Sequence, residues 1–292
     1  MRTSAPRPRY AWRWGRFALD LGPRTALMGI VNVTPDSFSD GGQYLDPAAA
    51  VDHCTRLAED GADILDVGVE STRPGAPEVP ADEEVRRVIP VIEAAAARLD
   101  IPISVDTSKP EVARAALDAG AAMINDVTAG GDPAMLELAA ACGVPIVLMH
   151  MQGTPRTMQD HPHYDDVVTD VARFLAARRD AASAAGVPDD LTVLDPGIGF
   201  GKTVRHNVEL IARLPELLAL GCPLLVGPSR KSFIGATLDL GAGERLIGTA
   251  AAVAACVLGG AHIVRVHDVA EMRQVCDLLD AVRAAAPGGP DA

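Results

Sequence analysis

The sequence contains few aromatic residues, an excess of acidic over basic residues, and no long apolar run. Phe, Trp and Tyr make up 3% of the 292 residues, although hydrophobic residues as a class make up 48%. Lys and Arg number 26 against 39 Asp and Glu, which gives a formal net charge of −13. That charge argues against nucleic acid and anionic membrane as partners. No apolar run approaches the roughly 18 residues that a membrane-spanning helix needs, so none is predicted.

The cysteines lack the Cys-x-x-Cys spacing that is typical of zinc sites and redox motifs. All five stand in apolar or helical contexts, at Cys54, Cys142, Cys222, Cys256 and Cys276. Such cysteines are typical of free thiols in a reducing cytoplasm, which is the compartment we expect. The Arg-rich N-terminus has no apolar segment of the kind found in a secretory signal, which agrees with that expectation.

Short apolar strands alternate with helical patterns along the chain. The strands lack the period-2 alternation of a half-exposed sheet, so both faces of the sheet are predicted to be covered. Eight strand–helix units predict an α/β fold, a single (β/α)8 TIM barrel. A flat, doubly wound sheet of six strands is the alternative. The predicted strands cover residues 26–33, 63–69, 101–105, 122–124, 145–149, 191–194, 223–226 and 263–266.

The barrel is predicted to occupy residues 25–286 as one domain, because no linker rich in Gly, Ser or Pro divides the chain. Residues 1–24 form an N-terminal extension. Within this extension, aromatic residues at positions 10, 12 and 14 alternate with other residues and predict a short strand or hairpin. Residues 287–292 are predicted to be a disordered tail.

Polar residues follow the apolar strands at the points where the strands end. In a (β/α)8 barrel the carboxyl ends of all strands meet at one mouth, so these side chains are predicted to form one site. A single Asn or Asp at such a place commonly caps a helix or forms a turn, and it is the repetition that favours a site. The candidates are Asn32, Thr72, Arg73, Asp106, Asn125, Met149, His150, Asp195, Lys231, Arg265 and His267.

These candidates divide into two chemistries. Asp106, Asn125 and Asp195 supply acceptors and an amide on one side of the barrel, and they suit a flat heterocycle that presents several N–H donors. A second group stands on the strands where the ring closes and suits a phosphate or diphosphate, with a cation near Asn32. Lys231 lies between the two groups. The second group consists of Asn32, Arg73, Arg265 and His267.

Two other motif resemblances fail on their spacing. Residues 197–203 are similar to a nucleotide-binding P-loop, but Pro196 stands where the first glycine of that loop is required. His150, His161 and His163 are loosely spaced, and no cysteine or glutamate completes a zinc site with them. The sequence therefore predicts neither an NTPase site nor a zinc site.

Two long motifs follow the first two predicted strands. They are GIVNVTPDSFSDGG at residues 29–42 and ESTRPGA at residues 70–76. Through them the chain resembles the dihydropteroate synthase family, from about residue 26 to about residue 282. Supporting motifs are SVDTSKP from Ser104, NDV from Asn125, LMHMQGTP from Leu148, DPGIGFGKT from Asp195, SRKSFIG from Ser229 and RVHDV from Arg265.

The resemblance implies a Mg²⁺-dependent transferase of folate biosynthesis. Members of this family condense 4-aminobenzoate with (7,8-dihydropterin-6-yl)methyl diphosphate, which gives 7,8-dihydropteroate and diphosphate. They are sulfonamide targets and usually homodimers that associate through late helices. In this chain, Cys256 and the alanine-rich face of residues 250–255 would fit such a contact.

The resemblance also implies roles for individual residues. The catalytic residues would be Asn32, Lys231, Arg265 and His267, with Asn32 as the ligand of the metal. The pterin pocket would consist of Asp106, Asn125, Met149, Asp195, Phe200, Gly227 and Lys231. The diphosphate would be bound by Asn32, Thr72, Arg73, Arg265 and His267. The 4-aminobenzoate pocket would consist of Phe38, Thr72, Arg73, Pro74, Ser229 and Lys231.

The second long motif departs from the family, which usually has Gly-Gly where Gly68 and Val69 stand here. A β-branched residue does not comfortably adopt a positive φ, so either that glycine is dispensable or the loop starts differently. Two alternatives stay open. One is a non-catalytic paralogue that binds pterin. The other is a pterin-dependent methyltransferase, which would leave both long motifs and the cationic group without a function.

Overall fold

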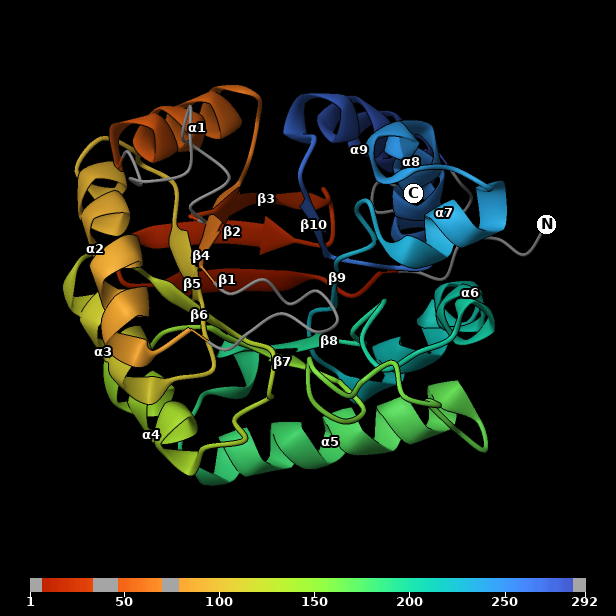
Figure 1. The fold of residues 1–292 in the computed structure, drawn as a ribbon, viewed down its shortest axis with the longest axis horizontal. Coiled ribbons are helices and arrows are strands. Elements are labelled where there is room, and N and C mark those ends of the chain that lie inside the picture. Colours follow the sequence, from red (N-terminus) through yellow and green to blue (C-terminus); the bar gives the residue numbers. More distant parts are fainter. Residues whose placement is uncertain (1–6, 34–46, 70–78, 286–292) are drawn as a thin grey trace.

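Within the part of the chain that the structure describes, eight parallel strands form the centre of the fold and helices surround them (Figure 1). The computed structural model describes residues 7–33, 47–69 and 79–285. The strand order is β8-β7-β6-β5-β4-β3-β10-β9, and a parallel bridge between Leu194 and Leu224 joins β8 to the chain just before β9. The predicted (β/α)8 barrel is therefore confirmed, and the alternative of a flat six-stranded sheet is wrong.

Each predicted strand overlaps an observed one. The barrel strands are β3 Ala26–Asn32, β4 Ile64–Gly68, β5 Ile103–Asp106, β6 Met123–Asp126, β7 Ile146–Met149, β8 Thr192–Asp195, β9 Leu225–Val226 and β10 Ile263–Val266. The α-helices are α1 Pro47–Glu59, α2 Ala81–Ala96, α3 Pro110–Asp118, α4 Pro133–Cys142, α5 Val167–Ala184, α6 Val204–Ala212, α7 Ser232–Leu238, α8 Leu246–Leu258 and α9 Val269–Ala284. Short 3-10 helices are η1 Asp189–Leu191, η2 Leu214–Leu220 and η3 Ala242–Glu244. In these described segments, no helix is long and apolar enough to cross a membrane.

Helices α6 and α7 differ from what the sequence pattern predicts. The apolar pattern places the start of α6 near Val208, but the helix begins at Val204 because Thr203 caps it: the Thr203 hydroxyl accepts from the His206 amide at 3.2 Å. Helix α7 was not predicted, because seven residues are too few to show a helical repeat of apolar positions.

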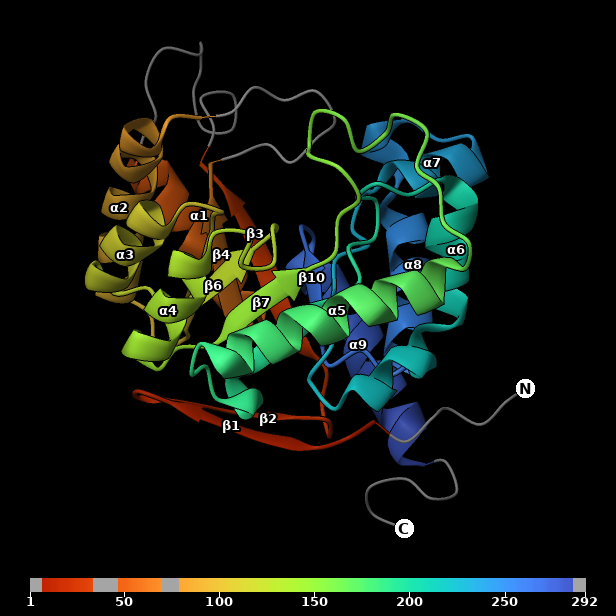
Figure 2. The same ribbon diagram turned by 90° about the horizontal axis from the view of Figure 1, so that it is seen from below.

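A two-stranded antiparallel hairpin crosses the amino-terminal end of the barrel (Figure 2). Its strands are β1 Tyr10–Trp14 and β2 Phe17–Leu21. The side chains of Trp12 and Trp14 are buried, and the Trp14 indole donates to the Ala122 carbonyl at 2.7 Å. The hairpin predicted from the aromatic alternation is confirmed, and it covers the end of the barrel opposite the predicted mouth.

One arginine of the N-terminal extension fastens that segment to the barrel. The buried Arg7 guanidinium pairs with Asp280 of α9 at 2.9 Å. It also donates to the Gly22 carbonyl, the Thr25 hydroxyl and the Ala261 carbonyl. Because Thr25, Ala261 and Asp280 belong to the barrel domain, the basic extension has a structural role at this position.

Candidate active site

Strand register places the predicted acceptors on one face of the sheet. Partners in a parallel ladder point to the same face, and so do residues two apart on one strand. Asp106 pairs with Asn125, Asn125 pairs with Val147, and Met149, two residues after Val147, pairs with Asp195. The predicted pterin-side residues on β5, β6, β7 and β8 therefore share the inner face of the barrel.

The predicted anion-side residues share that face. Arg265 of β10 pairs with Met28 of β3, and Asn32 lies four residues further along β3, so both side chains point inward. A Cβ atom at Gly227 would lie 3.7 Å from the Cβ of Arg265, which places this glycine on the same face. His267 follows Arg265 by two residues. Both halves of the predicted site thus meet at one mouth.

His150 does not join this group, although it stands where β7 ends. Its neighbour Met149 points inward, and the His150 ring packs outside the barrel against Phe174 of α5, with ring centroids 4.9 Å apart. Its Nδ1 lies 3.0 Å from the Lys202 ammonium. Among the described residues, no cluster of three His, Cys, Asp or Glu side chains could hold a metal ion.

A buried guanidinium stands between two carboxylates inside the barrel. Arg265 donates through Nε to Asp66 at 2.6 Å and through Nη2 to Asp106 at 2.8 Å. Burial lowers the pKa of Arg265, but the facing carboxylates of Asp66 and Asp106 outweigh this and raise the pKa. The same Asp66 oxygen accepts from the Asn125 amide at 2.9 Å. Arg265 is therefore a fixed cation.

Asp66 contacts two of the predicted site residues, although the sequence reasoning did not predict it. It stands in the middle of β4 rather than at its end, and its side chain is fully buried. The signal in the sequence was a lone carboxylate among apolar residues in a strand predicted to be covered on both faces. Buried carboxylates require partners, so such a residue predicts a buried cation or amide nearby.

An apolar wall lines the predicted pterin side of the mouth. Phe200 and Met149 form a buried cluster with Val127 and Met158. The Lys231 ammonium lies 3.9 Å from the centroid of the Phe200 ring. Burial and the nearby Arg265 lower the pKa of Lys231 to about 8, so the amine is still largely protonated at neutral pH. The sequence predicted Phe200, Met149 and Lys231, but not Val127 or Met158, which carry no chemical signal.

Asp195 is a buried, desolvated carboxylate of the predicted set. Burial raises its pKa to about 6, against the opposing effects of the Gly197 amide, which donates to it at 2.7 Å, and of Lys231, Lys202 and Arg265. Gly197 has φ +67°, and a Cβ there would lie 1.9 Å from the His150 carbonyl oxygen, so only glycine fits. The turn after β8 thus holds the carboxylate in place.

Ser229 holds the imidazole of His267. The Ser229 hydroxyl lies 2.9 Å from Nδ1 of His267 and accepts from the His267 backbone amide at 3.2 Å. Burial, and then the nearby Arg265, lower the pKa of His267 to about 4, so the ring is neutral at neutral pH. Arg230 has φ +56° and pairs with Asp268, which ties the β9 loop to the end of β10.

Four predicted residues, Phe38, Thr72, Arg73 and Pro74, lie outside the described residues. Val69, where the family usually has glycine, is described and buried, and it is not among the residues with positive φ. At Gly68, in contrast, an added Cβ would lie 2.9 Å from the Cβ of Asp106. Glycine is needed at position 68 for close strand packing, and position 69 accepts a β-branched residue.

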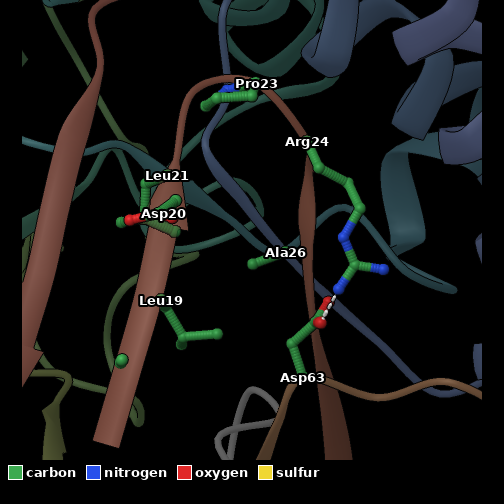
Figure 3. Close-up of a pocket in the computed structure, with 8 residues that line it drawn as sticks. Leu19, Asp20, Leu21, Pro23, Arg24, Ala26 and Asp63 are labelled. Atoms are coloured by element: carbon green, nitrogen blue, oxygen red, sulfur yellow. Dashed lines mark hydrogen bonds and ion pairs between the residues drawn. The ribbon is translucent and has the colours of Figure 1, made fainter.

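A separate pocket lies at the opposite end of the barrel and does not belong to this site. It encloses about 320 Å³ between the hairpin and the amino-terminal ends of β3 and β4 (Figure 3). Arg24, a cationic side chain of its lining, is paired with Asp63. Asp63 also accepts from the Leu27 amide at 2.8 Å. The charges there hold the fold together.

Comparison with known sequences gives one family. The model of the family described as "Pterin binding enzyme" matches residues 28–267. A dihydropteroate synthase of Synechocystis sp. is 49% identical over 270 residues, covering 92% of this chain and 93% of the relative. That of Escherichia coli K12 is 50% identical over 259 residues, covering 89% of this chain and 92% of the relative.

Solved structures of dihydropteroate synthases are similar to this fold. A Xanthomonas albilineans dihydropteroate synthase with 4-aminobenzoic acid has a TM-score of 0.88 at 51% identity, covering 96% of this chain and 100% of that one. A complex of the Xanthomonas albilineans enzyme with 7,8-dihydropteroate has a TM-score of 0.84 at 48% identity, with the same coverage. A Yersinia pestis dihydropteroate synthase in a sulfonamide drug complex has a TM-score of 0.89 at 46% identity, covering 95% of this chain and 100% of that one.

Asp195 should lower the stability of the folded protein at neutral pH. Its folded pKa of about 6 lies above its ordinary value of 3.8, so the charged form opposes folding above pH 3.8, with the full penalty above pH 6. We expect Asp195→Asn to raise the free energy of unfolding by about 1–3 kcal/mol at pH 7.5, and this gain should shrink toward pH 4.

Urea unfolding at pH 7.5 and at pH 4.5 measures this effect. Asp190→Asn, at an exposed carboxylate of η1, is the control and should change stability little at either pH. A variant at Asp195 that is less stable than the parent at pH 7.5, or a gain that does not depend on pH, would contradict the assignment of Asp195 as a desolvated carboxylate.

Proposed function

We propose how this site works from the premise that the chain belongs to the dihydropteroate synthase family. The protein is a transferase that condenses 4-aminobenzoate with (7,8-dihydropterin-6-yl)methyl diphosphate, which gives 7,8-dihydropteroate and diphosphate. Identity near 50% over about nine-tenths of the chain favours the synthase over a pterin-dependent methyltransferase or a non-catalytic paralogue. The main support for the mechanism is that the acceptors Asp106 and Asn125 share the inner face of the barrel with Arg265.

The acceptor side of the mouth suits the pterin. A pterin presents paired N–H donors on its amino-pyrimidine edge, and the free oxygen positions of Asp195 can accept from such a pair. Asp106 and Asn125 lie on the neighbouring strands β5 and β6 and offer further acceptors. The flat faces of the pterin ring would pack on the apolar wall of Phe200 and Met149.

The cationic side suits the leaving group. Breaking the carbon–oxygen bond leaves a benzylic-type cation that the electron-rich pterin delocalises, so the reaction needs no unusually strong base. It needs donors where charge develops on the diphosphate. Arg265 supplies a fixed positive charge, and His267 supplies a neutral ring whose pKa of about 4 would rise as an anion approaches. Lys231 and Ser229 belong to the predicted 4-aminobenzoate pocket.

His267 should act on the leaving group more than on pterin binding. Diphosphate develops its charge on the bridging oxygen only as the bond breaks, so donors to it strengthen in the transition state. We expect His267→Ala to lower kcat by about ten- to a thousandfold, while the affinity for a pterin without the diphosphate stays nearly unchanged. Steady-state kinetics and calorimetry measure the two effects.

The exposed His163 provides a control, because His163→Ala removes an imidazole in the loop before α5. That variant should keep both the rate and the affinity of the parent. If His267→Ala instead weakened binding of the simple pterin and kept a normal kcat at saturation, the division of the mouth into a pterin side and an anion side would be wrong.

We propose that Mg²⁺ takes part, with Asn32 as its protein ligand. Asn32 is exposed at the end of β3. Its side-chain carboxamide makes no hydrogen bond within the described residues. Mg²⁺ usually keeps several waters and is held by one or two protein oxygens together with substrate phosphates, so a single amide oxygen fits this ion. When bound, the ion would supply positive charge to the diphosphate.

Substitution at Asn32 tests this role. We expect Mg²⁺ to tighten the binding of pyrophosphate to the parent protein in calorimetric titrations. Asn32→Ala should lose about ten- to a hundredfold of that enhancement, and Asn32→Asp should keep it because a carboxylate oxygen is also a good ligand. Equal Mg²⁺ dependence in Asn32→Ala and the parent would place the ion elsewhere.

We also propose a homodimer that associates through α6, α7 and α8. A groove of about 260 Å³ between these helices is lined mainly by apolar side chains, among them Val208, Phe233 and Leu238. Ile247 of α8 precedes Gly248 of the groove lining and is 78% exposed. The expectation that Cys256 contributes to this contact is wrong, because that side chain is fully buried. Desolvation raises the pKa of its thiol to about 12.

A charge placed in the apolar surface tests the homodimer. We expect the parent to scatter light as a dimer and Ile247→Asp to shift toward a monomer, because a buried unpaired carboxylate is costly. Leu278→Asp, at another exposed apolar position on α9, is the control and should remain dimeric. A monomeric parent, or a dimeric Ile247→Asp protein, would contradict the proposed interface.

We propose a cytoplasmic location on the state of the cysteines. All five fall in the described part of the chain and are free, and four of them are buried. Burial raises the pKa of Cys54, Cys256 and Cys276 to about 12, which leaves these thiols protonated and unreactive. Free cysteines of this kind are typical of proteins in a reducing compartment.

A further inference from the structure

One buried carboxylate oxygen connects the two halves of the site. Oδ2 of Asp66 accepts from Nε of Arg265 at 2.6 Å and from Nδ2 of Asn125 at 2.9 Å. The three residues come from β4, β10 and β6, and the Asp66 side chain is fully buried. A displacement of this carboxylate would therefore displace Asn125 on the proposed pterin side and Arg265 on the proposed anion side together.

The contact with Asp66 sets the polarity of Asn125. A side-chain amide has a donor end and an acceptor end, and a carboxylate can only accept. Because Nδ2 of Asn125 donates to Asp66, its Oδ1 is the end that remains for a ligand. An acceptor is the group that a heterocycle with N–H donors requires at this position.

The contact with Asp66 also sets the plane of the Arg265 guanidinium. Asp66 binds Nε on one edge, and Asp106 binds Nη2 at 2.8 Å. Two hydrogen bonds to a planar group fix its orientation. The third nitrogen, Nη1, has no hydrogen-bond partner among the described residues and remains as the donor for a ligand anion.

Stability alone does not account for Asp66. Its Oδ1 is buried and has no hydrogen-bond partner among the described residues. The buried hydroxyl of Ser104 also has no hydrogen-bond partner among the described residues. Ser104 lies opposite Asp66 in the ladder between β4 and β5. A buried ion pair with an unsatisfied oxygen is commonly no more stable than apolar residues of similar volume. The position of Asp66 is better explained by what it does to its two partners.

We propose that Asp66 is a positioning residue, which holds the amide of Asn125 and the guanidinium of Arg265 in the orientations that binding and reaction require. The proposal rests on the proposed function, in which Asn125 contacts the pterin and Arg265 contacts the diphosphate. In this proposal Asp66 acts through Asn125 and Arg265 and not through a contact with a substrate. It differs from both partners because its loss should affect pterin affinity and kcat together.

Asp66→Asn removes the charge and almost nothing of the shape. The new carbonyl oxygen can take the place of Oδ2 but carries no negative charge, so both hydrogen bonds lose their charge assistance and hold the Asn125 amide and the Arg265 guanidinium less firmly. We expect the affinity for a pterin without the diphosphate and kcat each to fall by about ten- to a hundredfold, as for a misplaced site group. Ser104→Ala, at the paired position in the same buried layer, should change neither.

Double-mutant cycles separate positioning from a general structural effect. Added to Asn125→Ala, the Asp66 substitution should cost no further pterin affinity, and added to Arg265→Lys it should cost little further kcat. Additive losses in both cycles, or a loss of thermal stability with unchanged affinity and kcat, would overturn the proposal. Should Asp66→Asn fail to fold, Asp66→Ser, which leaves room for a water molecule, undergoes the same measurements.

The proposed function fails in a different way. If the parent protein released no pyrophosphate from the two substrates, the synthase mechanism would be wrong, whereas the calorimetric cycle between Asp66 and Asn125 would still report on the positioning of the amide. If the parent is active and that cycle is additive, the role of Asp66 is wrong and the synthase mechanism stands.

Discussion

The site depends on one ion-paired arrangement inside the barrel, in which Arg265 lies between the carboxylates of Asp66 and Asp106. A (β/α)8 barrel normally fills its interior with apolar layers. Here Asp66 of β4, Asp106 of β5 and Arg265 of β10 each place a charge on the same inner face. Their ion pairs hold these charges in fixed positions and so produce a fixed electric field inside the barrel. Such a field needs no reorganisation when substrate charge develops, which is the condition for electrostatic stabilisation of a leaving group.

Burial and, to a lesser degree, the charge of Arg265 shift the pKa values of the groups around this arrangement. Burial lowers the pKa of His267 to about 4 and that of Lys231 to about 8, and the positive charge of Arg265 acts in the same direction on both. Burial raises the pKa of Asp195 to about 6, and the nearby cations oppose that rise. At neutral pH, Lys231 and Asp195 are thus charged at a cost to stability, and substrate groups that pair with them would relieve part of that cost.

The sequence predicted the barrel and most of the described site because both depend on local patterns. Apolar strands with polar ends identify the mouth, and parallel register then brings Asp106, Asn125 and Asp195 to one face. It did not predict Asp66, because the partner that makes this carboxylate functional stands 199 residues away. Nor did it predict the burial of Lys202, whose ammonium donates to the Phe200 carbonyl at 2.9 Å and braces the loop after β8. Contacts of this kind come from tertiary packing, which no single-strand pattern reports.

One mouth of the barrel holds a pterin side and an anion side, and Arg265 contacts a residue of the pterin side. A crystal structure with a pterin and pyrophosphate bound together tests this arrangement most directly, through the positions of both ligands. We predict pterin N–H donors on Asp195 and on Oδ1 of Asn125, and the anion within hydrogen-bond distance of Nη1 of Arg265 and of His267. An anion that contacts neither Arg265 nor His267, or an Asn125 amide that turns its nitrogen toward the pterin, would contradict it.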